Sequence, residues 1–373
     1  MRPILEKCVQ MKLLAFRYSR YGWQLDLAQF SDQILLVGQN ASGKSNTVRA
    51  LAQVAALISQ KDTFAATEMM DAFLAFAIDE TKGLVYNFSV RDGVIVNELL
   101  RYKDTTKDGD IQIVTRDKES CVLQGENINP PTNKLVLNVR RDTQLYPQME
   151  LLQKWAENVI GFSFNEADKD GDSMNTSWFN ESNLTLNDIV TDMVKIPEAK
   201  EEFYAKMKET GYVINNIRTL NLGSQKKLLV YEDGLRTPIL DVTMSKGMFR
   251  TLYLIAYLLY FKRNKAGQPA MLLIDDLCEG LDYERSTKLG KLCFEMCEEL
   301  GIQLMASSND SFLMDVVDLK YWNILRRTGN RVEVINALGN PELFDHFEKT
   351  GLNNFDLFSS DFIARYKDKI SKQ

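Results

Sequence analysis

The stretch Ile34-Leu35-Leu36-Val37-Gly38-Gln39-Asn40-Ala41-Ser42-Gly43-Lys44-Ser45 decides the fold of this chain. Its apolar start predicts a buried strand, and the pattern G-x-x-x-x-G-K-S after it is a phosphate-cradling loop, or P-loop. Gly38 and Gly43 allow tight turns that point backbone N–H groups at a phosphate. The helix expected after the loop, from Ser45 to Ile58, adds the positive end of its dipole to the same site. The chain is therefore predicted to bind a nucleoside triphosphate.

Individual P-loop residues have predictable roles. Lys44 places a positive charge over the β- and γ-phosphates, and the Ser45 hydroxyl completes the coordination of Mg²⁺. We therefore expect ATP and Mg²⁺ as the ligands. The residues of this segment predicted to contact them are Gly38, Gln39, Asn40, Ala41, Ser42, Gly43, Lys44, Ser45 and Asn46.

The composition of the 373 residues, 45% hydrophobic and 26% charged, is that of a globular protein. Lys and Arg number 45 against 51 Asp and Glu, so the net charge of −6 provides no global basic field for nucleic acid. The longest apolar run, Met248 to Phe261, contains Arg250 and is too short to span a bilayer. A reduced, cytoplasmic protein without a membrane partner is expected. The sole histidine, His346, and five scattered cysteines argue against a zinc site: Cys8, Cys121, Cys278, Cys293 and Cys297.

A second acidic motif follows the apolar run Ala270 to Ile274. A run of this kind is typical of a strand buried on both faces of a parallel sheet, where ligands lie at the carboxyl ends of the strands. Asp275 is then placed to hold Mg²⁺ through its water shell, and Asp276 to orient an attacking water. Two carboxylates after one strand would alone be weak evidence for a nucleotide site, but the P-loop upstream makes this evidence strong.

The segment Met244 to Arg250 precedes a helical apolar run. Ser245 and Gly247 at a helix start can form an anion site, because a hydroxyl and free N–H groups would face a phosphate. An ordinary serine N-cap with Arg250 on the surface explains the same residues, and in isolation this explanation is favoured.

The order of these motifs resembles the ATP-binding-cassette (ABC) ATPase superfamily. P-loop, Ser-x-Gly-x-x-Arg signature, acidic strand and a D-loop (Glu279 to Asp282) follow one another as in its soluble SMC and RecF branch. Asn309 stands where many members carry a switch histidine. More narrowly, the chain resembles compact bacterial ABC-type ATPases classed among AAA-type domains, which are often encoded beside a nuclease or other effector in phage-defence loci. This narrower resemblance rests on residues 275–282, 308–310 and 350–356.

The resemblance implies an α/β fold: an ABC-ATPase head whose P-loop lies on a mixed sheet, with an antiparallel β subdomain and an inserted, mainly helical lobe. Residues 1–373 would form one ATPase domain. Its nucleotide-binding core would comprise 1–126 and 243–340, the inserted lobe 127–242, and the C-terminal tail 341–373.

The resemblance also implies a homodimer with two ATP molecules between its heads. Lys44, Ser45 and Asp275 would act in cis, whereas Ser245, Gly247 and Arg250 would contact the γ-phosphate in trans. Asp282 of the D-loop belongs to the same nucleotide-binding set, and Asp276 and Asn309 would be the catalytic residues. Because Asp276 is one methylene shorter than the usual glutamate and Asn309 cannot become a cation, slow hydrolysis is expected.

Three functions are compatible with these motifs. One is an ATP-driven switch or sensor that controls a separate effector such as a nuclease, in anti-phage defence. Another is a RecF- or SMC-like repair ATPase that binds DNA, with candidate contacts at Arg140-Arg141, Lys226-Lys227 and Arg326-Arg327. A transporter subunit is disfavoured, because the signature lacks the Gly-Gly-Gln ending. The sequence leaves open the identity of the effector and of the activating signal.

Other segments carry weaker signals. The spacing of Glu166, Asp168 and Asp170 is similar to that of the ligands in a calcium-binding loop. However, Ser177 stands where the last ligand, a glutamate, is required, so a solvated loop is favoured. The sequence does not locate the superfamily's Mg²⁺-binding glutamine: Gln53 and Gln60 are too close to the P-loop helix, which leaves Gln112 as a candidate. The aromatic tail from Phe344 to Phe362 is expected to pack on the domain, although a docking surface is the alternative.

Overall fold

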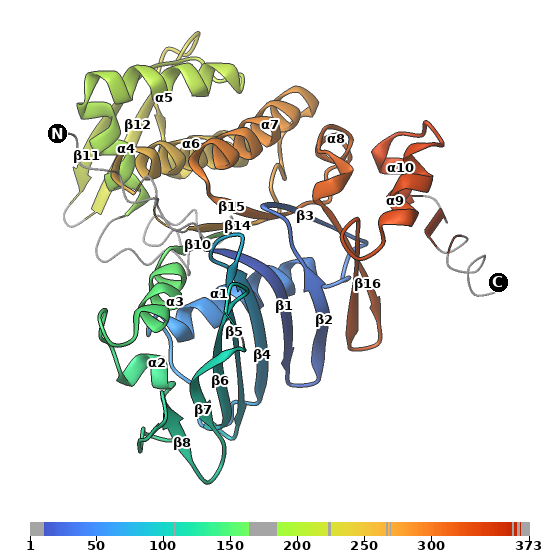
Figure 1. Ribbon diagram of the computed structural model, residues 1–373. Helices are drawn as coiled ribbons and strands as arrows, with labels where there is room; N and C mark the ends of the chain where they lie inside the picture. The colour runs from blue at the N-terminus through green and yellow to red at the C-terminus, as the bar shows by residue number, and fades with distance from the viewer. Residues whose placement is uncertain are drawn as a thin grey trace.

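A large mixed sheet of 14 strands runs through the molecule, and a smaller sheet of 3 strands lies apart from it (Figure 1). The structure is a computed structural model that describes residues 11–107, 109–163, 185–222, 225–265, 268, 270–359, 362–363 and 366. Cys8 and the stretch with the calcium-like spacing lie outside the described residues.

The P-loop strand β3 (Gln33–Val37) lies between β15 (Gln303–Ser307) and β16 (Trp322–Thr328) in the parallel part of this sheet. It pairs in parallel with both strands, and β15 continues the parallel pairing to β14 (Met271–Asp275) and β10 (Val159–Ser163). All carboxyl ends of these strands therefore meet at one edge, where the P-loop begins.

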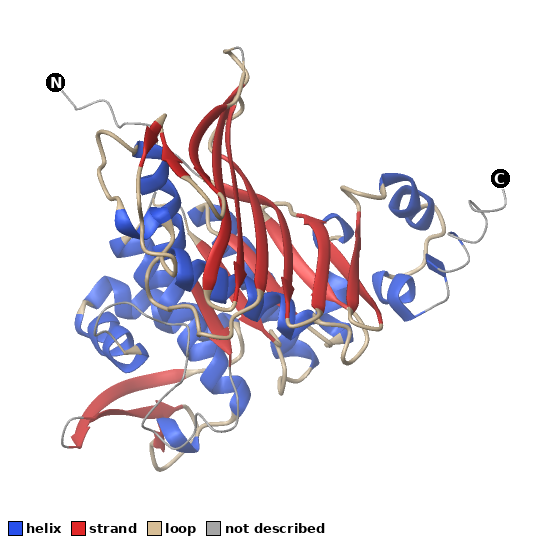
Figure 2. Ribbon diagram, turned by 90° about the horizontal axis from the view of Figure 1, so that it is seen from below, coloured by secondary structure: helices blue, strands red, loops and turns tan. Residues whose placement is uncertain are grey.

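The rest of the large sheet is mainly antiparallel and forms the predicted β subdomain (Figure 2). Strand β17 pairs in parallel with β2, and the strands beyond β2 alternate in direction. These strands are β17 (Arg331–Asn336), β2 (Trp23–Gln29), β1 (Lys12–Arg20), β4 (Met70–Ala77), β5 (Lys82–Arg91), β6 (Val94–Asp104), β7 (Ile111–Arg116), β8 (Cys121–Leu123) and β9 (Glu126–Asn127).

Helices cover both faces of the parallel strands. Successive side chains of these strands point to opposite faces of the sheet and are buried in two separate cores. Ile34 and Leu36 belong to the core with α1 (Lys44–Ile58) and the β subdomain, whereas Leu35 and Val37 belong to the core with α6 and α7. The remaining helices of the described chain are α2 (Val136–Val139), α3 (Pro147–Glu157), α4 (Leu186–Lys195), α5 (Pro197–Glu209), α6 (Lys246–Asn264), α7 (Tyr283–Leu300), α8 (Ser311–Val316), α9 (Pro341–Glu348) and α10 (Asn354–Ser359).

Residues 127–242, expected to form the inserted lobe, contain helices and a small sheet. Pro197 separates α4 from α5, because proline cannot donate the backbone bond of a helix interior. A small sheet follows, formed by β11 (Ile214–Leu222), β12 (Gln225–Glu232) and β13 (Ile239–Leu240). Strand β10, which lies within the same range, pairs with β14 of the large sheet.

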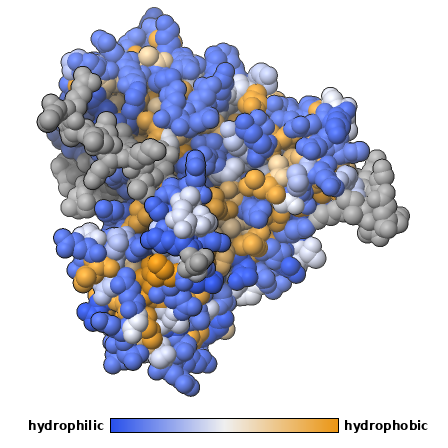
Figure 3. Space-filling view, viewed as in Figure 1, coloured by the Kyte–Doolittle hydropathy of each residue, from blue (hydrophilic) through white to orange (hydrophobic). Residues whose placement is uncertain are grey.

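The surface and the tail follow ordinary burial rules. Figure 3 shows a largely hydrophilic face with hydrophobic residues interspersed around its centre and lower part.

In the C-terminal tail, Phe344 and Phe347 are buried, and Phe355 and Phe362 pack partly buried against the same core, as expected. His346 is exposed on α9. The four cysteines within the described ranges are buried free thiols. None of the helices described combines the length and hydropathy of a bilayer span.

Gln303, on β15, links β1 to the parallel strands through hydrogen bonds of its side chain. Its side chain accepts a hydrogen bond from the backbone N–H of Leu13 (2.9 Å) and donates to the carbonyl oxygen of the same residue (2.8 Å). A third bond joins it to the carbonyl oxygen of Ser31 (3.0 Å). Residues from both ends of the sequence therefore hold β3 in place.

Glu98 is a buried acid in the β subdomain. Its carboxylate accepts hydrogen bonds from the Val136 N–H at the start of α2 (2.9 Å) and from the Tyr86 hydroxyl (2.9 Å), and Arg116 lies 3.7 Å away. Burial raises the pKa of Glu98 to about 7, although these three neighbours favour the charged form. The acid is therefore harder to ionise in the folded protein than in the unfolded chain.

We expect Glu98 to make folding stability pH-dependent. The unfolded chain loses the Glu98 proton near its ordinary pKa of 4.5, and the folded protein loses it near 7. The free energy of unfolding should therefore fall between these values by up to about 3 kcal/mol and stay constant above them. Urea unfolding of wild type and Glu98→Gln at pH 5 and pH 8 measures this, with the exposed Glu126→Gln as control. A difference between wild type and Glu98→Gln that is equal at both pH values would contradict the expectation.

Candidate functional site

The P-loop adopts a backbone that its glycines require. Gly43 has a φ of 108°, in the left-handed region, and directly precedes α1. A Cβ atom on Gly38 would lie 2.5 Å from Ser42 Oγ and 2.8 Å from the carbonyl oxygen of Leu325, so no larger residue fits there. Ala41 also has a positive φ of 62°. The loop thus turns sharply around a space bordered by backbone groups.

The residues of the loop suit a phosphate group. No side chain caps the N-terminus of α1, and its first turn contains no acidic residue, so its N–H groups and dipole can act on an anion. Ser42 Oγ is buried and has no hydrogen-bond partner among the described residues. Lys44 is 5% exposed, and its ammonium group donates to the carbonyl oxygens of Gly38 (2.7 Å) and Gln39 (3.2 Å). Gln39, Asn40 and Asn46 are exposed around this loop.

Asp275 and Asp276 lie close enough to Lys44 to influence it. Burial lowers the pKa of Lys44, and the negative charges of Asp276 and Asp275 oppose this shift. The structure therefore brings together the P-loop lysine and the acidic pair that follows β14, which are more than two hundred residues apart in the sequence.

Ser307, at the end of β15, organises the acidic pair. Its hydroxyl donates to Asp275 Oδ1 (2.7 Å) and accepts from the backbone N–H of Asp276 (2.8 Å). Asp276 has a positive φ of 55°, which is uncommon for a residue other than glycine and turns the chain away from the strand direction. Burial raises the pKa of Asp276, as do the nearby carboxylates of Asp275 and Glu279, against the positive charges of Arg250 and Lys44.

Asp275 has the properties of an indirect Mg²⁺ ligand. It is 5% exposed, and its Oδ2 atom lies 3.8 Å from the Arg49 guanidinium, a positive charge that partly compensates the buried carboxylate. Ser45, in the first turn of α1, is half-buried next to Lys44. These oxygen donors suit a hard cation, so Ser45 and Asp275 are the residues that would hold Mg²⁺.

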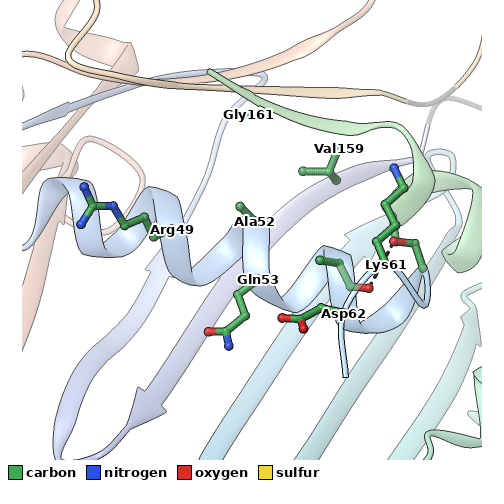
Figure 4. A pocket seen from close by; sticks show the side chains of 10 residues that line it. Arg49, Ala52, Gln53, Lys61, Asp62, Val159 and Gly161 are labelled. Atoms are coloured by element: carbon green, nitrogen blue, oxygen red, sulfur yellow. Dashed lines mark hydrogen bonds between the residues drawn. The ribbon is translucent and has the colours of Figure 1, made fainter. Parts of the chain in front are cut away.

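A pocket of about 460 Å³ lies along α1. Arg49, Ala52 and Gln53 line it from the helix, and Lys61 and Asp62 lie at the end away from Arg49 (Figure 4). Arg49 is the lining residue that also lies 3.8 Å from Asp275.

The signature segment forms a second group of residues with the D-loop of its own chain. Ser245 is exposed and caps α6 by accepting from the Met248 N–H (3.2 Å). A Cβ atom on Gly247 would lie 2.4 Å from Leu281 Cδ2, so this glycine permits close packing on the D-loop. Asp282 caps α7, accepting from the Arg285 N–H (3.0 Å). Both readings of Ser245, helix cap and exposed anion contact, are compatible with this geometry.

Arg250 does not occupy the position expected of a residue acting in trans. It is 2% exposed, and its guanidinium donates within its own chain to the carbonyl oxygen of Asp276 and to Glu279 Oε2 (2.7 Å). Contact with a partner's nucleotide would require it to leave these bonds. The apolar surroundings of α6 bury its charge, and the Glu279 carboxylate provides the counter-charge.

Asn309 and the candidate glutamines lie in different places. Asn309 is exposed directly after Ser308, whose hydroxyl donates to the carbonyl oxygen of Leu277 (3.1 Å), so it stands near the acidic loop. Gln53 accepts bonds from Tyr18 and Arg20. Gln60 Nε2 donates to the Asn138 carbonyl oxygen, and Gln112 is on β7, near the far edge of the sheet. The backbone residue opposite Asp275 on the neighbouring strand is Ser163, the last residue of β10.

Three contacts around the acidic pair were not predicted from the sequence, those of Ser307, Arg49 and Glu279. Ser307 is a serine at the carboxyl end of a buried strand, and this position was the available signal. Arg49 lies one and a half turns after the P-loop, and only the folded structure connects it to Asp275. Glu279 was noted as part of the D-loop, but its bond to Arg250 joins residues 29 positions apart and leaves no local pattern.

Comparison with known families identifies the chain. Residues 34–315, which run from β3 through the signature and the acidic pair to α8, match the family model described as "AAA domain, putative AbiEii toxin, Type IV TA system". The chain belongs to this family. This AAA-domain protein has a mixed α/β fold, with a large mixed sheet and a separate antiparallel sheet, as expected from its motifs.

Solved structures of related heads were also found. An SMC head bound to the C-terminal winged-helix domain of ScpA shares 14% identity, covering 87% of this chain and 97% of that chain, with a TM-score of 0.49. An SMC head domain from Thermotoga maritima shares 13% identity, covering 87% of this chain and 98% of that chain, with a TM-score of 0.40. RecF with ATPγS shares 11% identity, covering 88% of this chain and 100% of that chain, with a TM-score of 0.34. A search of the curated proteins found no match.

Proposed function

We propose that this ATPase is a slowly hydrolysing switch that forms a homodimer around two ATP molecules and controls a separate effector in anti-phage defence. The observation that carries the proposal is a division of roles among the motif residues. Lys44, Asp275 and Asp276 lie together at the P-loop, whereas Ser245 is exposed at the start of α6, whose Gly247 packs on Leu281 of the D-loop. A second copy that offers its signature to the P-loop would complete the site.

The division has a mechanistic consequence. Contacts between a P-loop and a partner's signature would exist only when a γ-phosphate is present, so ATP would stabilise the closed dimer and hydrolysis would release it. Bound Mg²⁺ would neutralise phosphate charge, with Ser45 and Asp275 holding it. Asp276 would orient the attacking water, and Lys44 would stabilise charge on the phosphates.

An effector separate from this chain is supported by the family and by the lack of other chemistry. The family description names a putative toxin of a toxin–antitoxin system, and such a system includes a second component. Within the described residues, no cluster of three or more histidine, cysteine or acidic side chains could hold a catalytic metal. A nuclease or other effector would then have to be a different protein.

Binding of DNA, the second candidate function, has less support from the basic pairs. Arg141 is bonded to Glu150 (2.8 Å) and Glu157 (3.0 Å), and the Lys226 ammonium pairs with Asp188. Charges that are already paired contribute little to binding of phosphate groups. Stimulation of hydrolysis by duplex DNA, with a steep salt dependence, would favour the RecF-like alternative.

Dimerisation provides the test. We expect Asp276→Asn, which should bind ATP without hydrolysing it, to double its mass in ATP and Mg²⁺ when measured by analytical ultracentrifugation. Ser245→Arg in the same background should stay monomeric, because the long side chain at the signature would block the partner's phosphate. Thr243→Arg, two residues away and also exposed, is the matched control and should still dimerise. A monomer in all conditions would overturn the proposed dimer.

A further inference from the structure

A buried arginine of the signature helix is bonded to the loop that carries Asp276. Arg250 is one of the largest fully buried side chains of the described chain, and its guanidinium joins α6 to residues 276–279. One nitrogen donates to the carbonyl oxygen of Asp276 and another to the Glu279 carboxylate at 2.7 Å. An arginine can make two such bonds in a fixed planar geometry, which a lysine cannot.

The loop that Arg250 holds has an unusual backbone. Asp276 and Cys278 both have positive φ values, 55° and 73°, and neither is a glycine. Such conformations cost free energy and persist only where neighbouring contacts enforce them. On one side the loop is held by Ser307, which bonds to the Asp276 N–H, and by the Leu277 N–H, which donates to the Ser307 carbonyl oxygen (2.8 Å). Arg250 holds it from the opposite element, α6.

From these contacts we infer that Arg250 is a positioning residue: it fixes the Asp276 peptide and thereby aims the Asp276 carboxylate at the water that attacks ATP. The inference rests on the proposed function, because it concerns the same hydrolytic site. Loss of the Arg250 bond frees the carbonyl end of the Asp276 peptide while leaving Lys44 and the P-loop backbone unchanged. ATP binding is then retained, and the chemical step slows.

Glu279 connects this arrangement to the surface. Arg250 is 2% exposed, whereas the Glu279 side chain is 59% exposed, so the ion pair runs from the core to solvent beside the signature. A protein that docks on the D-loop and withdraws Glu279 from Arg250 would loosen Asp276. The hydrolytic step is thus coupled to contacts made on the signature side of the same chain.

Two measurements on the full chain test the inference. The first is hydrogen exchange of the backbone amides of residues 276–282 without nucleotide, which does not depend on hydrolysis. Arg250→Met should exchange faster there than wild type, and Arg250→Lys by less. Glu284→Gln, which changes a neighbouring exposed acid paired with Lys288, should leave the exchange unchanged. Unchanged exchange in Arg250→Met would overturn the inference. Thermal unfolding of each variant identifies any global loss of fold.

The second measurement is single-turnover phosphate release at saturating ATP, together with binding of a fluorescent ATP analogue. Arg250→Met should lose about tenfold to a hundredfold in rate, as expected for a displacement near 1 Å, while its affinity changes less than about threefold. In the Asp276→Asn background, Arg250→Met should cause no further loss, because both changes affect one group. Equal losses in affinity and rate, or additive losses, would overturn the inference. A wild-type protein without turnover would contradict the proposed hydrolysis, and the exchange result would still decide the role of Arg250.

Discussion

The Lys44→Ala variant is expected to lose phosphate release from ATP by about a hundredfold or more, since removing one preorganised positive group from a phosphate site typically costs that much. Lys44 is the P-loop ammonium, buried within the loop at 2.7 Å from the Gly38 carbonyl oxygen. In the presence of ATP it can exchange these carbonyl contacts for the phosphates. No other residue of the loop carries a positive charge.

Phosphate release measured against a no-enzyme blank, with ATP affinity measured in parallel, tests this expectation. Lys61→Ala is the matched control, because Lys61 is a partly buried lysine just beyond the opposite end of α1 and donates to the Glu157 carbonyl oxygen (3.0 Å). It should keep both ATP binding and turnover. Wild-type activity in Lys44→Ala would mean that hydrolysis occurs elsewhere or through a contaminant.

The Asp276→Asn variant should separate hydrolysis from binding. We expect its turnover to fall by about a hundredfold, since an amide cannot accept a proton from the attacking water as a carboxylate can. Its ATP affinity should change little, because Asp276 is not a P-loop residue and the Ser307 bond to its backbone N–H does not need the carboxylate. The isosteric change preserves the volume of this half-buried site.

A comparison with Asp275→Asn makes this result specific. Asp275 is expected to act through Mg²⁺, so its loss should raise the Mg²⁺ concentration needed for activity, whereas Asp276→Asn should leave that concentration unchanged. Titration of Mg²⁺ at saturating ATP measures the difference. Full turnover in Asp276→Asn would show that another group orients the water, and the exposed Asn309 beside it would be the next residue to replace.

The phosphate site could be predicted because its chemistry is local. The P-loop packs a strand, two obligatory glycines and a lysine into twelve residues, and Asp275 follows a strand of apolar residues only. Helix α6 was also expected, from the apolar run that begins at Met248, close to its observed start at Lys246. In each case a short segment contains the whole signal.

Other parts of the fold depend on distant contacts. Strand β4 alternates buried and half-buried residues but contains three alanines, which have low strand propensity, so its pattern was overlooked. The β16–β17 hairpin turns at Gly329-Asn330, a recognisable signal that the sequence analysis did not use. Strand β10 is only five residues long and directly follows a helix, so its pairing with β14 is what identifies it as a strand. The Arg250–Glu279 bond likewise has no counterpart in a local pattern.

The fastening of the first strand by Gln303 has a consequence for synthesis on the ribosome. Leu13 and Gln303 are 290 residues apart, and β3 pairs with β15 and β16, which emerge late in translation. The P-loop strand therefore lacks its two neighbours until β15 and β16 have left the exit tunnel, and contacts of such separation form slowly. A nascent chain that ends before β15 would then be unable to engage ATP, so nucleotide binding begins only after these late strands have joined the sheet.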